Sequence, residues 1–372
     1  MRTFRCNCGN RLFFENYHCL QCKRDLGFIV ELRQLVSLQP TADHYYLPVT
    51  AKPGSTTTYK KCINYQREKV CNWMLPADSV EQHCLSCRLN RLLPDLDKPN
   101  NRLYWARFEH AKRYLIYGLL QLQLPLIDRQ HDPLHGLCFD FLADRTMGED
   151  HVEQVLTGHS SGLITINMAE ADHVAREEAR VKMGEPYRTL LGHLRHESGH
   201  YYWAHLVNDT PWIAPFRQLF GDERQDYSQA LRTHYQHGCP PHWQQDFISA
   251  YASAHPWEDW AETWAHYLHM RDTLETCYDF EVMPENADIP EIANLPPGNM
   301  QGYNLFSAML HDWSKLSVLL NGLNRSMGLS DAYPFVLSKQ ATQKLKFVHQ
   351  VICAYYRRPN RQAQASLSSA LA

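Results

Sequence analysis

The sequence predicts an α+β protein, mostly α, in which small cysteine-rich modules precede a longer helical body with a short sheet. Three observations lead to this prediction. Eight of the 12 cysteines lie within the first 87 residues. In the rest of the chain, apolar residues recur at helical spacing in several long segments, and two short apolar runs are typical of strands. Of the 372 residues, 44% are hydrophobic and 21% are charged, a balance that can bury a full core.

Charge and hydropathy exclude several classes of protein. The formal net charge of −3 argues against a dedicated nucleic-acid-binding protein, although residues 1–100 carry 14 Lys and Arg against 9 Asp and Glu. No apolar run approaches the roughly 20 residues that span a bilayer. The first ten residues, MRTFRCNCGN, contain no apolar signal segment. We therefore expect a cytoplasmic protein without membrane contact, for which nucleic acid is not the favoured partner.

The first module is predicted to be a zinc ribbon over residues 1–35. It contains two close cysteine pairs, whose members are Cys6, Cys8, Cys19 and Cys22. Each close pair forms a tight turn that aims two thiolates at one ion, and two such turns complete a tetrahedral sulfur site. Zinc also supplies folding energy that so short a segment cannot obtain from a core. The alternatives are unpaired structural thiols, or a site in which His18 replaces one thiolate.

The second module, within residues 36–100, is predicted to be another zinc site followed by a linker. Its four cysteines are Cys62, Cys71, Cys84 and Cys87. The alternative is a redox-active or free-thiol pair at Cys84 and Cys87 with two core cysteines, but no βαβ pattern surrounds this pair. Because four thiolates close the coordination sphere and leave no position for a water, neither cluster is expected to be catalytic.

The body, residues 101–358, is predicted to be built from helices and a few strands, in front of a flexible polar tail at 359–372. The first helix carries Trp105, Phe108 and Leu115 at helical spacing, and a later helix carries Trp257 and Trp264 on one stripe. The two strands are apolar and partly β-branched or aromatic. In chain order, the predicted elements are a helix at 102–122, strands at 136–142 and 162–168, and helices at 187–207, 257–272, 303–321 and 339–356.

The body contains a metal-binding pattern, His196-Glu197-Ser198-Gly199-His200. On a helix, residues four apart lie one above the other, so His196 and His200 can direct ring nitrogens at one metal. Glu197 then lies beside them, in the position of a base for a metal-bound water. The alternative is a solvated helix face rich in His and Glu.

A third ligand is predicted on a later helix. Glu258 and Glu262 are four residues apart beside a stripe of buried aromatic residues, where carboxylates are costly unless they are paired or bind a metal. A catalytic zinc has three protein ligands and one open position, and Glu258 supplies the third. Glu262, one turn further, can accept the free ring N–H of a ligating histidine. His193 lies on the same face as His196, either as an alternative ligand or, more commonly for such a residue, as a supporting group.

These residues resemble the gluzincin class of metallopeptidases, with HExxH on one helix, a Glu ligand on a later helix and an acidic residue four positions beyond it. The segment from Tyr251 to Glu262 is locally similar to the catalytic domain of anthrax lethal factor, which has a Tyr seven residues before the ligand Glu. The resemblance implies that Tyr251 stabilises the developing oxyanion. It also implies that the strand at 162–168 pairs with an extended substrate, the alternative being an ordinary core strand.

Over nearly its full length the chain also resembles a bacterial family of zinc-binding metallopeptidases with an N-terminal zinc ribbon. The similarity includes the Cys-Asn-Trp at 71–73 and the CRLNR at 87–91. It implies a zincin-like helical metallopeptidase domain behind small zinc-ribbon-type modules.

The predicted activity is therefore zinc-dependent peptide hydrolysis on a peptide or protein substrate, with one catalytic and one or two structural zinc ions. Hydrolysis of a non-peptide amide would use the same chemistry. The alternative function is a protein- or nucleic-acid-binding zinc-ribbon module attached to a body that does not cleave. In either case the zinc modules can offer a surface to a protein partner.

Overall fold

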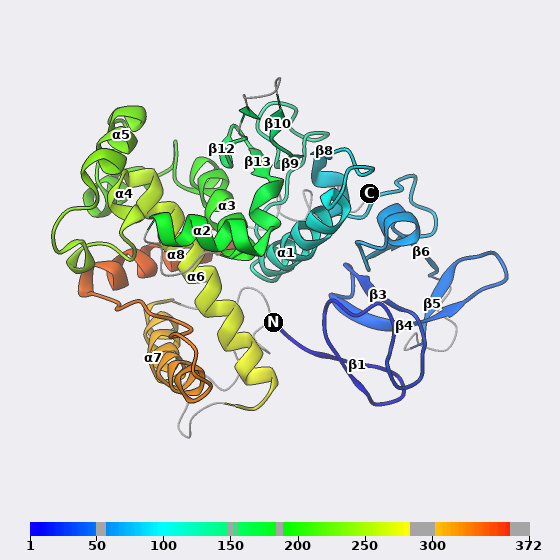
Figure 1. Cartoon of the computed structure of the whole chain (residues 1–372). Helices are drawn as coiled ribbons and strands as arrows, with labels where there is room; N and C mark the ends of the chain where they lie inside the picture. The colour runs from blue at the N-terminus through cyan, green and yellow to red at the C-terminus, as the bar shows by residue number, and fades with distance from the viewer. Residues whose placement is uncertain (50–56, 147–151, 154, 184–188, 283–301, 358–372) are drawn as a thin grey trace.

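The computed structural model describes residues 1–49, 57–146, 152–153, 155–183, 189–282 and 302–357. It confirms the predicted class, α+β and mostly α (Figure 1). The predicted tail at 359–372 lies outside the described residues. None of the helices within the described ranges is long and apolar enough to cross a membrane.

The N-terminal part is built from short strands. A two-stranded antiparallel ribbon comes first, followed by a five-stranded antiparallel sheet in which consecutive strands are neighbours. A bridge between Phe28 and Trp73 joins the two ends of this sheet. In order, the strands are β1 (Phe4–Arg5), β2 (Arg11–Leu12), β3 (Leu26–Ile29), β4 (Gln34–Pro40), β5 (Tyr46–Pro48), β6 (Tyr59–Lys61) and β7 (Met74–Pro76), with a π-helical turn, η1 (Asn64–Glu68), before β7.

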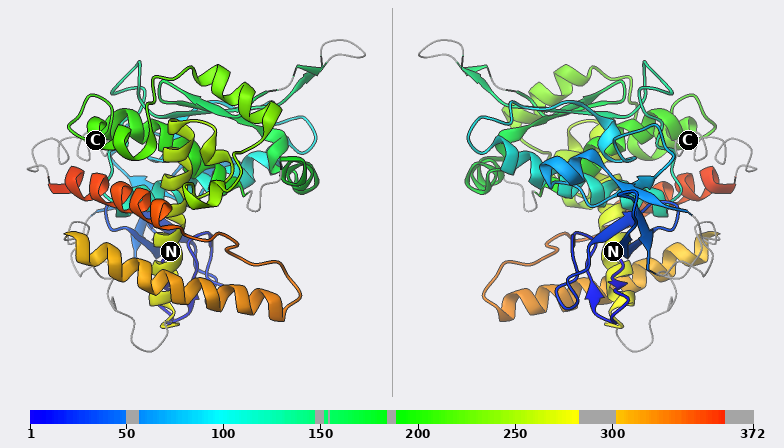
Figure 2. Two further views of the ribbon diagram at one scale, coloured as in Figure 1. Left: turned by 90° about the vertical axis from the view of Figure 1, so that its left-hand side faces the viewer. Right: turned by 90° about the vertical axis from the view of Figure 1, so that its right-hand side faces the viewer.

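The body has a four-stranded sheet and a set of helices. The strand order is β12-β13-β9-β8, with β12 antiparallel to β13 and the other pairs parallel. The strands are β8 (Asn90–Leu92), β9 (Cys138–Leu142), β12 (Gly158–Ser160) and β13 (Leu163–Asn167), and a separate ribbon of β10 (Arg145–Thr146) and β11 (Val152–Glu153) extends away from the body (Figure 2).

Eight α-helices are found among the described residues. The helices expected at 102–122, 187–207, 257–272, 303–321 and 339–356 correspond to α1, α3, α6, α7 and α8, while α2, α4 and α5 were not expected. Their bounds are α1 (Asn101–Gln121), α2 (His173–Met183), α3 (Leu190–Leu206), α4 (Ile213–Phe220), α5 (Tyr227–His237), α6 (Pro256–Asp279), α7 (Gly302–Ser326) and α8 (Lys339–Arg357). Short 3-10 turns complete the set: η2 (Cys87–Leu89), η3 (Met168–Ala171), η4 (Trp243–Gln245) and η5 (Tyr251–Ser253).

The N-terminal part and the body share one hydrophobic core. Phe14, which follows β2, packs against Tyr114 and Tyr117 of α1, with ring centroids 5.3 and 5.1 Å away. Strand β8 precedes α1 in the chain, yet it forms an edge of the body's sheet by pairing with β9. The N-terminal strands therefore lie directly against α1 (Figure 1).

One expectation about the sheet is wrong. The strand expected at 162–168 is present as β13, but it pairs with β12 on one side and β9 on the other. Its inward side chains Ile164 and Ile166 are buried, which fits the alternative of a core strand. Since both backbone edges of β13 are occupied, an extended substrate cannot pair with it. Among the described strands, the edge nearest α3 belongs to β12, which the sequence pattern did not reveal.

Candidate active site

The site lies where α3 and α6 cross, and a glycine allows these helices to approach closely. A Cβ atom added to Gly199 would lie 2.9 Å from the Cα of Ala261, which is closer than real Cβ contacts. The indole N–H groups of Trp260 and Trp264 donate to the Gly199 carbonyl at 2.8 Å and to Ser198 Oγ at 3.2 Å. The aromatic stripe on α6 therefore fixes the position of the His196–His200 turn.

Local capping determines where each of these helices begins. The N–H of Gly192 donates to the Thr189 hydroxyl at the start of α3, and the N–H of Trp257 donates to His255 Nδ1 at the start of α6. Proline follows His255 at the first position of α6, where its missing N–H costs nothing. Glu258 then falls in the first turn, where the helix dipole favours a negative charge.

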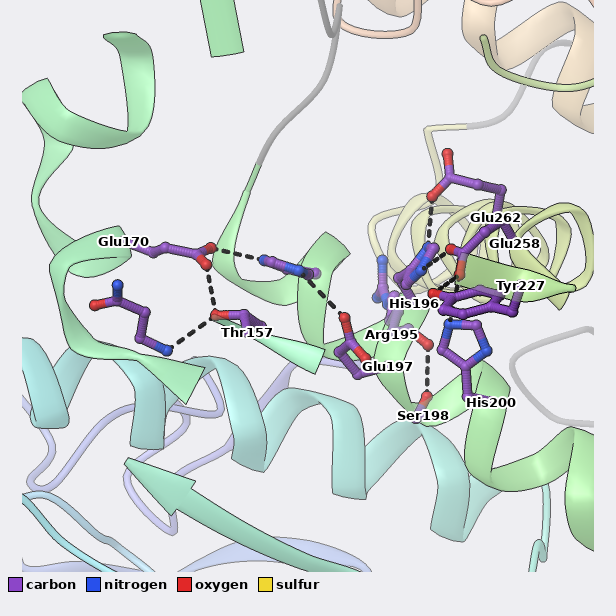
Figure 3. Close-up of polar contacts among 12 residues, drawn as sticks. Thr157, Glu170, Arg195, His196, Glu197, Ser198, His200, Tyr227, Glu258 and Glu262 are labelled. Carbon is purple, nitrogen blue, oxygen red and sulfur yellow. Dashed lines mark hydrogen bonds and ion pairs between the residues drawn. The ribbon is translucent and has the colours of Figure 1, made fainter. Parts of the chain in front are cut away.

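The structure brings together the three predicted metal ligands. The ligand atoms of His196, His200 and Glu258 all lie within 4.8 Å of one another. Nε2 of His196 lies 3.0 Å from Oε2 of Glu258, and Nε2 of His200 lies 3.6 Å from Oε1 of the same carboxylate (Figure 3). Glu258 is 1% exposed, so its charge is compensated by these neighbours rather than by water.

The contacts of His196 leave a place for a positive charge between these groups. Its Nδ1 lies 2.6 Å from Oε1 of Glu262 and donates there, so in the neutral ring Nε2 carries only a lone pair. That lone pair faces the buried Oε2 of Glu258, 3.0 Å away. Two acceptors at 3.0 Å repel unless a positive charge lies between them. A divalent metal with nitrogen and oxygen ligands suits this donor set.

The pKa values of Glu258 and His196 reflect the charges that surround them. Burial opposes the charge of Glu258, but His200 and His196 hold the pKa of its carboxyl well below the usual range. Burial would likewise lower the pKa of His196, yet Glu258 and Glu262 raise it well above the ordinary value. The site is therefore arranged to hold positive charge between buried carboxylates.

Glu197, the predicted base, is buried and lies next to the ligands. Burial opposes its charge, but hydrogen bonding to His193 and the nearby His196 lower its pKa. His193 is not part of the ligand group, because its Nδ1 lies 2.7 Å from Glu170 and its Nε2 lies 3.3 Å from Glu197. It is thus placed as a supporting group rather than as an alternative ligand.

Tyr251 lies at the site, on the 3-10 turn η5 just before α6. Its ring centroid is 5.9 Å from that of His196. Burial, together with the charge of Glu258, raises the pKa of its phenol well above the usual value, so that it keeps its proton. A protonated phenol facing the ligand helix can act as a hydrogen-bond donor.

Sequence reasoning did not find two further residues at the site. The hydroxyl of Tyr227, at the start of α5, donates to Oε1 of Glu258 at 2.7 Å. The hydroxyl of Ser249 donates to Oε2 of Glu262 at 2.6 Å and accepts the N–H of Ala252 in η5. Ser249 therefore connects the partner of His196 to the turn that carries Tyr251. Neither residue has a motif around it, so their positions could come only from the fold.

The first cysteine cluster converges as predicted. Its four sulfur atoms come together, with Cys6 to Cys22 at 3.5 Å and Cys8 to Cys19 at 3.6 Å. The N–H groups of Gly9 and Lys23 close the two turns by donating to the carbonyls of Cys6 and Cys19, and both Gly9 and Lys23 have positive φ angles. His18 is not in the group.

The second cluster also converges, but deeper in the molecule. All four of its cysteines are buried, and the sulfur atoms of Cys71 and Cys84 lie 3.7 Å apart. Backbone N–H groups of Trp73 and Cys84 donate to the sulfur atoms of Cys71 and Cys62, each at 3.4 Å. A zinc–sulfur distance of about 2.3 Å gives a tetrahedral edge of about 3.8 Å, which matches the spacing in both clusters. Every cysteine of the clusters is a free thiol here, so no disulfide pair is present within them.

Comparison with known proteins is consistent with this geometry. Residues 101–351 match a family model described as "Putative zinc-binding metallo-peptidase". The chain belongs to this family. Ahead of the metallopeptidase match, residues 3–98 match a zinc-ribbon domain model. The expected family relationship is thereby confirmed, and zinc binding is supported by both matches and by the three ligand clusters.

The relatives of this family member include three mycobacterial proteins, one from Mycobacterium bovis and two from strains of Mycobacterium tuberculosis. Each is 42% identical to the chain over 354 residues, which cover 95% of this chain and 95% of the relative. Each is named only as an uncharacterized protein. No solved structure matches the chain. The local similarity to anthrax lethal factor therefore rests on the residues around Glu258 alone.

Proposed function

We propose that this protein is a zinc metallopeptidase of the gluzincin type, in which His196, His200 and Glu258 hold the catalytic metal. The observation that carries this proposal is the convergence of ligand atoms of His196, His200 and Glu258, which all lie within 4.8 Å of one another around a buried carboxylate. A divalent cation bound by these three groups would compensate the charge of the buried carboxylate. The presence of Glu262 one turn beyond the ligand, with His196 as its partner, supports the gluzincin assignment.

Each residue has a chemical task in the proposed reaction. A zinc ion in this site would lower the pKa of a water to around 7 and polarise the substrate carbonyl. Glu197 accepts a proton from the attacking water and passes it to the leaving amine. Tyr251 donates its phenolic O–H to the oxygen on which negative charge develops. Tyr227 orients the ligand carboxylate of Glu258 through their 2.7 Å hydrogen bond.

The substrate class that we propose is an extended peptide or a protein. A non-peptide amide would undergo the same attack, because the metal and Glu197 act only on the carbonyl and the leaving nitrogen. The two cysteine clusters are proposed to hold structural zinc, since their sulfur spacings of 3.5 to 3.7 Å suit a tetrahedral ion. The cytoplasm, where thiols stay reduced, is the compartment consistent with such sites.

The test combines cleavage of a diverse peptide mixture with elemental analysis of the purified protein. Three ligand clusters predict three zinc ions in the wild type and two in His196→Ala. Glu197→Gln should retain all three and lose turnover by more than about 100-fold, because only the base is removed. His205→Gln is the matched control, since His205 lies on the same helix, against Tyr201 and outside the cluster.

The outcomes separate the proposed functions. Full activity in Glu197→Gln would contradict the assignment of the base, and an unchanged zinc count in His196→Ala would contradict the ligand set. Cleavage of small amides but of no peptide would favour a non-peptide substrate. Loss of zinc in His196→Ala without any turnover by the wild type would favour a binding protein whose body does not cleave.

A further inference from the structure

Glu197 is connected to a chain of polar side chains that extends away from the metal ligands. His193, one turn earlier on α3, lies with its Nε2 3.3 Å from Oε1 of Glu197. Its Nδ1 lies 2.7 Å from Oε2 of Glu170, in the 3-10 turn after β13. Oε1 of Glu170 in turn accepts the hydroxyl of Thr157 at 2.6 Å. Figure 3 shows Thr157, Glu170 and Glu197 along this line.

Each link of this chain is held by the backbone around it. The hydroxyl of Thr157 accepts the N–H of Asn167 at 2.9 Å, which ties the start of β12 to the end of β13. The side chain of Asn167 accepts the N–H of Ala169 at 2.8 Å and so caps the turn that carries Glu170. Glu170 is therefore presented to α3 by a fixed turn rather than by a free loop.

The arrangement assigns a direction to each hydrogen bond. Ionised Glu170 can only accept, so Nδ1 of His193 must carry the proton on that side. Nε2 then faces Glu197, a second carboxylate that is 4% exposed. A neutral ring would place a lone pair against Oε1, whereas a proton between Nε2 and Oε1 gives an attractive contact. Two buried carboxylates on either side of one imidazole are balanced best when the ring is a donor to both.

We propose that His193, held by Glu170 and Thr157, is a positioning residue for Glu197. Its Nε2 donates a hydrogen bond to Oε1 of Glu197, so that the carboxylate keeps one orientation. The other oxygen of Glu197 is then available for the proton of the attacking water. This inference rests on the proposed function, because it assumes that Glu197 is the base. The logic is that of outer partners that orient a catalytic side chain and are not themselves in contact with the substrate.

The kinetic test compares two substitutions of His193 in the zinc-loaded full chain. His193→Ala removes both contacts and should lower kcat by about 10- to 100-fold while KM changes by less than about twofold. His193→Gln keeps an amide donor near the position of Nε2 and should recover much of that loss. The kcat of Glu170→Gln should fall between those of the two His193 variants, because His193 stays but its partner loses the negative charge that strengthens their hydrogen bond. The zinc content should remain that of the wild type in all three.

A merely structural role predicts a different pattern. If His193 only fills space, His193→Gln and His193→Ala should behave alike, and zinc content or the unfolding midpoint should fall in parallel with kcat. His205→Gln, on the same helix, should leave kcat unchanged. Wild-type kcat in His193→Ala would overturn the proposal.

A second readout does not depend on cleavage. Crystal structures of the zinc-loaded wild type and of His193→Ala should show one Glu197 conformer in the former and two or more in the latter. An unchanged, singly ordered Glu197 in His193→Ala would overturn the proposal even if the protein cleaves peptides. Conversely, loss of Glu197 order in a protein that cleaves no peptide would support the positioning role and contradict only the proposed activity.

Discussion

The two cysteine clusters each consist of four thiols, yet they lie in different surroundings. In the first cluster Cys8 is exposed and Cys22 is partly exposed, and the contacts come from Asn10, just before β2, and from Ser37 of β4. The second cluster is fully buried and lies against α1 of the body, where Oε2 of Glu109 is 3.9 Å from the sulfur of Cys87.

The difference shows that the second cluster is a joint between the N-terminal part and the body. Two buried charged residues of α1 lie next to it, Glu109 and Arg113, and the buried Lys112 pairs with Glu109. Burial would lower the pKa of Arg113, but the nearby Cys71 thiolate raises it. Four thiolates around a zinc ion leave a net negative charge, and in a buried place that charge needs cations beside it. Arg113 of the body supplies such a cation, whereas the first cluster is open to solvent at Cys8 and partly at Cys22.

The largest expected effect is that of Cys84→Ser in the second cluster. Structural zinc contributes roughly 10 kcal/mol or more of folding energy, which is comparable with the whole stability of a domain at about 5 to 15 kcal/mol. We expect this variant to lose soluble folded protein, and with it the zinc of the second cluster. Soluble yield, circular dichroism and zinc content measure this.

Its control is Cys277→Ser, a partly exposed thiol outside both clusters. This variant should fold with the wild-type zinc content. A well-folded Cys84→Ser that still holds all its zinc would show that the second cluster does not bind a zinc ion that joins the N-terminal part to the body.

The cysteine pattern predicted the membership of both clusters but not their different depths. Spacing shows which thiols can share an ion, whereas burial depends on what packs over them. Glu109 and Arg113, which lie next to the second cluster, are on α1, and neither has a motif that marks it as a partner of the cysteines. The five-stranded sheet also escaped prediction, because strands such as β6 (Tyr59–Lys61) are too short to show an alternating pattern.

In the active site, too, sequence motifs predicted some of the residues, and only the fold revealed the others. Residues at fixed spacing on one helix, such as His196 and His200, could be assigned from the sequence, and Glu258 followed from the chemistry of a third ligand. Tyr227 could not, because its contact with Glu258 joins residues of two helices that lie 31 positions apart in the sequence. Glu170 reaches His193 from the turn after β13, and Thr157 contacts Glu170 from just before β12, at sequence separations that no local pattern records.

An intermediate effect is expected for Arg113→Met, which tests the charge compensation of the joint. Arg113 is 2% exposed and donates to the carbonyl of Val70. Its loss leaves the buried negative charge of the cluster uncompensated, so we expect a destabilisation of about 3 to 5 kcal/mol in chemical denaturation. Arg113→Lys should recover part of this loss by restoring the charge.

The matched control for that experiment is Arg102→Met on the same helix. Arg102 is exposed and pairs with Glu68 at the surface, so its replacement should cost less than about 1 kcal/mol. Equal effects at the two positions would mean that charge compensation is not what distinguishes the second cluster.

The smallest effect on the body is expected for Cys8→Ser in the first cluster. Cys8 is exposed, so a loosened ribbon can unfold locally while the core around α1 stays packed. We expect the loss of one zinc ion and new proteolytic cleavage within residues 1–35.

The unfolding midpoint of the body should fall by only a few degrees, because the contacts of Phe14 with Tyr114 and Tyr117 weaken. Peptide cleavage, where the wild type shows it, should persist. If Cys8→Ser instead aggregates as completely as Cys84→Ser, the ribbon is as integral to the fold as the joint, and the contrast between the two clusters fails.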